Sequence, residues 1–131
     1  MFDDIEQTAT FIRDAIRDIP KQFDYNGKAQ SKLDKERQDI MHYMEFCNLN
    51  ASDGCKAYKD FQRVSKERRK HKNENELLAE INNIFIKLKP HINELDQAIG
   101  SLRKVKTNQN NRTYKCKVRN DLQDKFEGAG K

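Results

Sequence analysis

The longest stretch without a helix breaker lies between Gly54 and Pro90. Proline removes a backbone donor, and glycine costs about 1 kcal/mol in a helix interior, so their absence permits a continuous helix. The whole chain has only 2 Pro and 5 Gly in 131 residues, too few turn-forming residues for a typical β-fold. We therefore predict an all-α fold with one long helix over about residues 51–88. A bend or short loop near residues 72–75 remains open.

Apolar residues repeat at helical spacing near the start of the chain and predict a helix over residues 5–19. Asp3 or Asp4 can cap its start, and Pro20 is expected to end it. The following sequence, DYNGK, is typical of a turn in which Gly27 adopts a positive φ.

A second apolar stripe predicts a helix over residues 28–48. The polar segment 48–54 interrupts the pattern. Asn50 or Ser52 can then serve as the N-cap of the long helix.

Pro90 suits the first turn of a fourth helix. Residues 106–113 are expected to form a polar loop, residues 114–118 a short extended segment, and the next residues one or two helical turns. The predicted architecture is a four-helix array with a short extended and helical C-terminal arm. Residues 1–122 would form a single helical domain, and residues 123–131 a flexible tail.

The apolar content is low for a folded chain. Leu, Ile, Val and Phe number 28 of 131 residues, and 36% of residues are charged. A core then requires nearly every large apolar side chain, or surface from a second chain. A homodimer through the 51–88 helices, antiparallel, is one expectation. The residues expected to be largely buried are Ile12, Ile16, Ile40, Met44, Tyr58, Phe61, Ile81, Phe85, Leu95 and Ile99.

Charge is distributed unevenly along the chain. Residues 1–48 contain seven Lys/Arg and ten Asp/Glu, whereas the remainder is strongly basic and brings the net charge to +5. Such polarity suits an acidic partner or head-to-tail packing. Two basic runs provide the candidate partner-binding residues. The first contains Lys59, Arg63, Lys66 and Lys70 as one ridge, extended by Arg68, Arg69 and Lys72; the second contains Arg103, Lys104, Arg112, Tyr114, Lys115, Lys117 and Arg119.

Other chemistry has weaker support in the sequence. His42 and His91 each precede a Glu by three residues, but this order is the reverse of the helical di-iron motif, so no metal is expected. The spacing of the three cysteines matches no zinc module or disulfide framework. No phosphate loop or nucleophile motif occurs, so neither a cofactor nor enzymatic activity is expected. No apolar run could span a membrane, which favours a soluble cytoplasmic protein without membrane partners.

Four pieces of the sequence form a recognisable order: Asp39 to Tyr43, the small residues that open the long helix, Arg68 to Lys70 ahead of Glu74 and Glu76, and Arg112 with Tyr114. Together they resemble a family of small uncharacterised proteins encoded by phages and prophages of Gram-positive bacteria. The resemblance covers about residues 30–122. It implies an all-helical phage accessory protein in the host bacterial cell, and it implies no catalytic residue.

The expected function is non-enzymatic binding of a macromolecular partner through a basic helical surface. A host or defence protein, or a protein–nucleic-acid complex, is the first hypothesis, with Tyr43, Phe46 and Tyr58 as aromatic anchors. Direct binding to DNA or RNA is the alternative. Glu74, Glu76 and Glu80 weaken the alternative, because they follow the first basic run directly.

Overall fold

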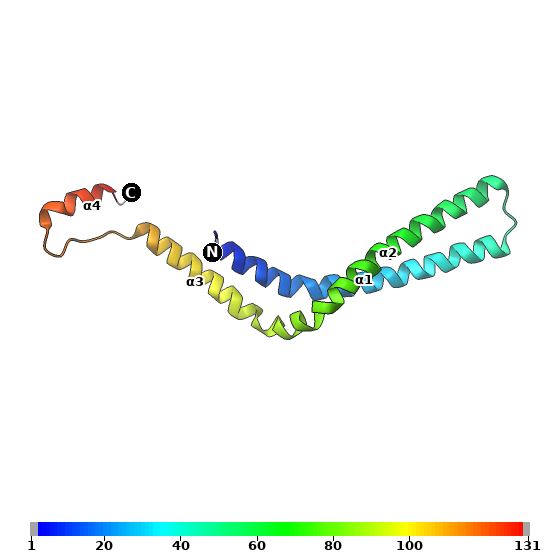
Figure 1. Cartoon of the computed structure of the whole chain (residues 1–131), viewed down its shortest axis with the longest axis horizontal. Helices are drawn as coiled ribbons and strands as arrows, with labels where there is room; N and C mark the ends of the chain where they lie inside the picture. Colours follow the sequence, from blue (N-terminus) through cyan, green and yellow to red (C-terminus); the bar gives the residue numbers. More distant parts are fainter. Residues whose placement is uncertain (1–2, 130–131) are drawn as a thin grey trace. The chain divides into compact units, whose positions relative to one another are not determined.

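The protein is all-helical, as predicted. The computed structural model describes residues 3–129, and no strand occurs within that range. The elements are α1 (Ile5–Phe46), α2 (Ala51–Leu88), a 3-10 turn (Lys89–His91), α3 (Ile92–Asn111), a second 3-10 turn (Asn120–Leu122) and the short α4 (Gln123–Ala129) (Figure 1).

Helix α1 corrects the expectation of two helices separated by a turn. It continues through Pro20 and through Gly27, which has no positive φ. Proline in a helix interior costs about 3 kcal/mol. The buried or half-buried residues Ile16, Ile19 and Phe23 keep their spacing across it. Packing on both sides of Pro20 therefore outweighs its local cost, so residues 3–129 form three long helices in place of the four expected.

Helix α2 has the predicted bounds and is continuous through residues 72–75. Its N-cap is Asn50, whose side-chain oxygen accepts a hydrogen bond from the backbone N–H of Asp53 at 2.8 Å. This bond satisfies one of the donors that every helix start leaves free.

The C-terminal third differs from expectation in two places. Helix α3 extends to Asn111, so most of the predicted polar loop 106–113 is helical. Polar residues do not end a helix unless one of them offers the backbone a better partner or a required turn. Residues 123–129, expected to be a flexible tail, form α4. The end of that predicted tail, residues 130–131, lies outside the described residues.

The chain divides into two compact units. One contains residues 14–90, and the other contains residues 1–13 with residues 91–131. The boundary falls within α1, between Arg13 and Asp14. That residues 1–122 form a single domain remains a prediction.

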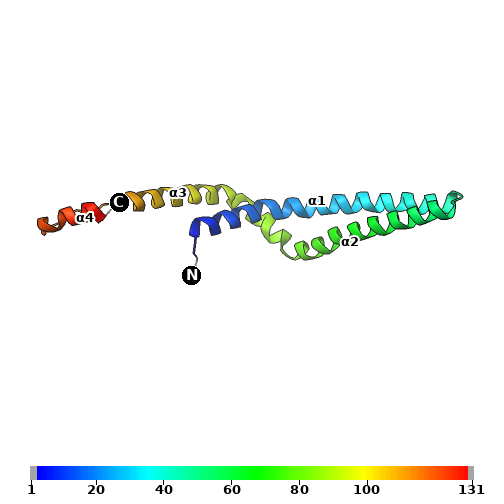
Figure 2. The same ribbon diagram turned by 90° about the horizontal axis from the view of Figure 1, so that it is seen from above.

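The unit of residues 14–90 is an antiparallel helical hairpin of α1 and α2, which lie side by side in both views (Figures 1 and 2). Its contact line, here called the seam, follows alternating three- and four-residue steps on both helices, the spacing of a coiled coil. Every seam residue is buried or half-buried. The seam residues are Ile16, Ile19, Phe23, Asn26, Gln30, Leu33, Arg37 and Ile40 of α1, and Ala57, Phe61, Val64, Arg68, His71, Asn75, Leu78, Asn82 and Phe85 of α2.

The middle of this seam is polar. Asn26 is fully buried, and its side-chain amide donates to the carboxylate of Glu74 at 3.0 Å. Its oxygen accepts from Gln22 and lies 2.9 Å from Nδ1 of His71. A buried amide of this kind must be hydrogen-bonded to be tolerated, and the network supplies those partners. The polar stretch of α2 is therefore part of the helix contact.

In the other unit, residues 5–13 of α1 pack antiparallel to α3. Arg13 donates to Asp96 at 2.8 Å, and Arg103 donates to Glu6 at 2.6 Å. Ile99 is buried at its centre. In the arm, the ring of Tyr114 lies 5.1 Å from that of Phe126, and Gln123 accepts a hydrogen bond from the backbone of Cys116.

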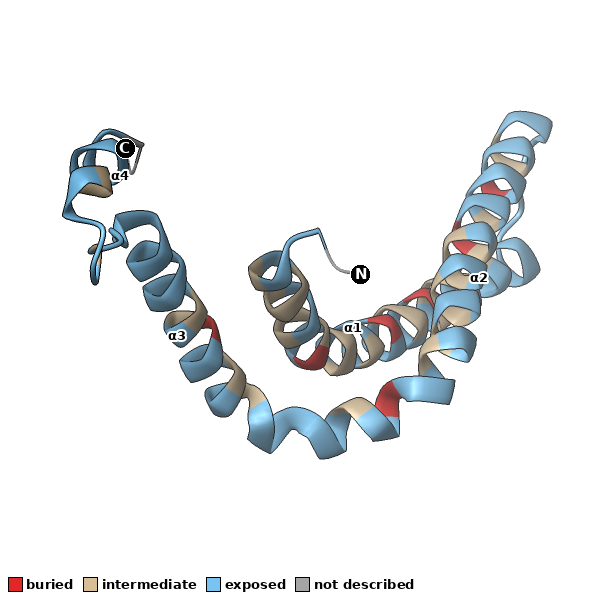
Figure 3. Ribbon diagram, turned by 60° about the vertical axis from the view of Figure 1, so that its left-hand side comes forward, coloured by how far each residue is buried: buried red, intermediate tan, exposed pale blue. Residues whose placement is uncertain are grey.

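The core is thin. Only five apolar residues are buried among those described: Ile16, Leu33, Ala57, Val64 and Ile99 (Figure 3). Of the ten residues predicted to be buried, Ile16 and Ile99 are, whereas Ile40, Phe61, Phe85 and Leu95 are half-buried. The prediction was wrong for Ile12, Met44, Tyr58 and Ile81, which are exposed. A two-helix contact can cover one stripe per helix, and Tyr58 and Ile81 lie beside that stripe.

Candidate partner-binding surfaces

The residues of the first basic run fall into two groups, those that are exposed and unpaired within residues 3–129 and those that are paired or partly buried. Lys59, Lys66, Arg69 and Lys70 are exposed and lie on the side of α2 away from α1. None of them forms an ion pair with any described residue. At 1.5 Å per residue they span about 17 Å of helix. We call these four residues the outer basic face.

Arg63 lies beside the outer basic face, but its guanidinium is already paired with carboxylates. Its guanidinium contacts Glu67 and Glu36 at 3.4 Å and Asp60 at 3.8 Å. Partial burial acts to lower the pKa of Arg63, but the three carboxylates, led by Glu67, outweigh it and hold the pKa above its ordinary value. This residue contributes less positive field than the sequence suggested.

Arg68 has a structural position. It is a seam residue, its side chain is 20% exposed, and its Nε donates to the carboxylate of Asp34 on α1. Lys72 is half-buried. The structure therefore separates both residues from the four cations that are open to solvent.

The second basic run starts on α3 and is partly neutralised by α1. Glu6 accepts hydrogen bonds from Arg103 at 2.6 Å and from Lys106 at 3.3 Å. These bonds hold the pKa of Glu6 below its ordinary value of 4.5. Arg103 thus joins α3 to the start of α1.

The rest of the second run is more open. Lys104, Arg112, Lys115 and Lys117 are exposed and form no ion pair in the described range of the chain. Arg119 pairs with Asp121 at 2.7 Å, which raises the pKa of Arg119 and lowers that of Asp121. Tyr114 is 55% exposed and packs on Phe126, so one ring face is already in contact. This second group and the outer basic face lie in different units.

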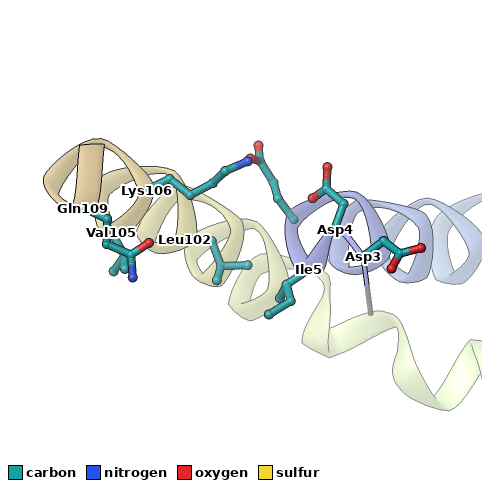
Figure 4. Close-up of a pocket in the computed structure, with 8 residues that line it drawn as sticks. Asp3, Asp4, Ile5, Leu102, Val105, Lys106 and Gln109 are labelled. Carbon is teal, nitrogen blue, oxygen red and sulfur yellow. The ribbon is translucent and has the colours of Figure 1, made fainter. Parts of the chain in front are cut away.

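Next to the Glu6 pairs, the start of α1 and the middle of α3 border a hollow of about 380 Å³ (Figure 4). Ile5 and Val105, 61% and 50% exposed, line it together with Leu102. Charged residues, among them Asp3, Asp4 and Lys106, complete its lining.

The three expected aromatic anchors are all accessible. Tyr43 is 43% exposed, Phe46 is 73% exposed and Tyr58 is 58% exposed. Phe46 also stacks on the imidazole of His42, with ring centroids 5.5 Å apart. These residues gather near the turn of the hairpin, where α1 ends and α2 begins.

The polar residues of the seam are the group that the sequence argument missed. Beyond Asn26 and His71, the amide oxygens of Asn75 and Asn82 are buried without a hydrogen-bond partner among the described residues. Both residues line a cavity of about 530 Å³ beside Pro20 and Gly27. The available signal was the unbroken three- and four-residue spacing from Arg68 to Asn82, which continues where apolar residues stop.

Within residues 3–129, no group of three or more His, Cys, Asp or Glu side chains is arranged so that it could hold a metal ion. His42 and His91 each lie 3.5 Å from the Glu three residues later on the same helix. Cys47 and Cys55 are exposed, Cys116 is half-buried, and all three are free thiols. Among the described helices, none has the length and apolar character that crossing a membrane requires.

Comparison with known proteins gives no match to a family model, to a curated protein or to a solved structure.

Proposed function

We propose that this chain is a non-enzymatic accessory protein that binds an acidic macromolecular partner through the outer basic face of α2. The observation that carries this proposal is the exposure of Lys59, Lys66, Arg69 and Lys70 without any ion pair in the described chain. Four such cations along about three turns of one helix exceed what solubility requires, because a merely soluble face mixes both signs.

The seam strengthens the proposal by holding the face rigid. The polar contacts of Arg68 and His71 fix the rotation of α2 against α1, so that the neighbouring Lys66, Arg69 and Lys70 point outward together. Preorganised side chains lose less entropy on binding. We expect electrostatic attraction to govern the association rate, and the exposed Tyr43, Phe46 and Tyr58 to supply apolar contacts.

The resemblance to phage and prophage proteins suggests in which cell the protein acts and which kind of partner it binds. In that setting, the partner is a protein of the host or of its defence systems, or its complex with nucleic acid, in the host cytoplasm. A surface that presents cations and aromatic residues suits an acidic protein face.

A pull-down from a Gram-positive host lysate, with and without nuclease, tests this function. The informative variant is Lys66→Ala, Arg69→Ala and Lys70→Ala combined. We expect partner affinity to fall at least tenfold, or about 1.4 kcal/mol, and its salt dependence to weaken. The free energy of unfolding should change by about 0.5 kcal/mol or less per substitution, because all three side chains are exposed.

The matched control removes three exposed lysines from α1: Lys21→Ala, Lys32→Ala and Lys35→Ala. It changes net charge equally but leaves the outer basic face intact. Equal loss of binding in both triple variants would reduce the effect to net charge and refute the proposal. Unchanged binding in the α2 variant would identify the face as ordinary solvated helix.

Direct binding to DNA or RNA is the second candidate. It is favoured by the open cations Arg112, Lys115 and Lys117, which surround Tyr114 in the arm. Capture that disappears with nuclease, together with an affinity that falls steeply as salt rises, would favour this function over the first.

A further inference from the structure

Helix α2 has a second apolar row, which the described structure leaves partly exposed to solvent. Leu77, Ile81, Ile84 and Leu88 follow each other at steps of four, three and four residues. On average, the four residues lie about 100° around the helix from the seam. Their exposed fractions are 75%, 36%, 57% and 37%. Isolated exposed apolar residues are ordinary, but four in one continuous row are a contact surface.

The spacing of this apolar row defines what fits on it. Steps of four and three residues are those of a coiled-coil contact, so the complementary surface is another helix with the same spacing. The row is nearly symmetric under reversal, since the order from either end is Leu, Ile, Ile, Leu. An antiparallel second copy of α2 therefore presents the same row in matching register, as a two-fold interface requires.

Flanking charges agree with this arrangement. When Ile81 of one copy faces Ile84 of the other, Glu80 comes opposite Lys87 of the other copy, and the two-fold axis repeats the pair. Neither residue forms an ion pair in the described chain. They are seven residues apart on α2, too far for an ordinary intrahelical pair. The opposite charges are thus explained by a contact between copies.

The same side of α2 also shows where the interface ends. Continuing the row toward the N-terminus gives Glu74, Lys70, Glu67, Arg63 and Asp60, an alternation of charges. Arg63 already pairs there with Asp60 and Glu67. Apolar contact is restricted to the last third of α2. This region is separate from Lys59 and Lys66 of the outer basic face.

We infer that the chain forms a reversible antiparallel homodimer through Leu77, Ile81, Ile84 and Leu88 of α2, flanked by Glu80–Lys87 pairs. The exposed parts of the four apolar side chains together amount to about two whole side chains per copy. A standard stable interface contains about 20–30 residues on each side, so this interface is far smaller. The dimer is accordingly weak and exchanges with monomer.

Sedimentation equilibrium of the full chain over a wide concentration range tests this interface. The parent should pass from 15.5 kDa toward twice that mass. Ile84→Asp should weaken dimerisation by at least about tenfold, because it places a carboxylate in the apolar row. Ile86→Asp is the matched control: Ile86 is 49% exposed on the same helix but lies outside the row, and its variant should remain within about threefold of the parent.

Charge reversal gives a second, independent measurement that does not disturb the apolar row. Glu80→Lys and Lys87→Glu alone should each weaken the dimer by about three- to tenfold, since each brings like charges together twice. The double variant should return to within about twofold of the parent. A monomer at every concentration, equal effects at Ile84 and Ile86, or a double variant no better than the singles would each overturn the inference.

Discussion

At the scale of single residues, the most informative side chain is Asn26. It is fully buried in the polar middle of the seam, and it is bonded to Gln22, Glu74 and His71. A buried polar residue in a coiled coil fixes register at some expense in stability. Here it fixes which residues of α2 turn outward, and so it connects the seam to the outer basic face.

Replacing Asn26 with Ala should lower the free energy of unfolding by about 1–3 kcal/mol, because His71 and Glu74 lose a buried hydrogen-bond partner. Urea denaturation followed by circular dichroism measures the change. Asn83→Ala, an exposed position on α2, should cost about 0.5 kcal/mol or less. A similar cost for both would mean that the buried network contributes nothing specific.

Glu6 gives the fold a pH dependence with a definite sign. Its folded-state pKa is held below 4.5, first by the hydrogen bond from Arg103 and then by that from Lys106. Such a group stabilises the fold above its ordinary pKa and loses that contribution as the pH falls through the folded-state value. Thermal melts from neutral pH down into this acidic range should show a smaller pH dependence for Glu6→Gln than for the parent. Glu76→Gln, which removes an exposed carboxylate from α2, should leave the dependence unchanged.

At the scale of elements, α1 shows how packing overrides local signals. Pro20 and the DYNGK sequence both indicate an interruption, yet the helix is continuous from Ile5 to Phe46. A helix of this length is held by its contacts with α2 and α3 more than by propensity. Helix α2 follows its local signals throughout, because it has a cap at Asn50 and no breaker after Gly54 in its first turn.

Gly27→Ala tests whether α1 is a continuous helix or is interrupted by a turn at Gly27. A Cβ at this position meets nothing within 4 Å, and the backbone is helical. The substitution should therefore raise the free energy of unfolding by about 0.5–1 kcal/mol. In a turn with positive φ, the same change would destabilise the protein. Chemical denaturation gives the sign directly, and a loss of stability would contradict the continuous helix.

At the scale of the whole molecule, the small core and the large charged surface together determine the stability of the fold and its tendency to associate. Five buried apolar residues, distributed over two units, provide modest stabilisation. Apolar side chains such as Leu77 and Ile84 remain at the surface, where binding can add burial that folding does not supply. Stability and association are then linked by mass action.

The melting temperature should consequently rise by a few degrees between about 2 and 200 µM protein, because only folded chains dimerise and dimerisation therefore stabilises the folded state. Differential scanning calorimetry at both concentrations measures this shift. In Ile84→Asp the rise should disappear, whereas in Ile86→Asp it should persist. A melting temperature independent of concentration in the parent would argue against self-association.

The sequence by itself determined the helical class and the bounds of α2, and it narrowed the N-cap of α2 to Asn50 or Ser52, because these depend on periodicity and on residues adjacent in the chain. It also located the two basic runs. The tertiary structure decided what local signals cannot carry: that Pro20 lies within a helix, that Arg68 faces α1 while Lys66 faces solvent, and that Arg103 and Lys106 are bound to Glu6. Each of these depends on a contact with a residue far away in the chain. A charged residue in a polar stretch has the same local pattern whether a distant carboxylate binds it or water does.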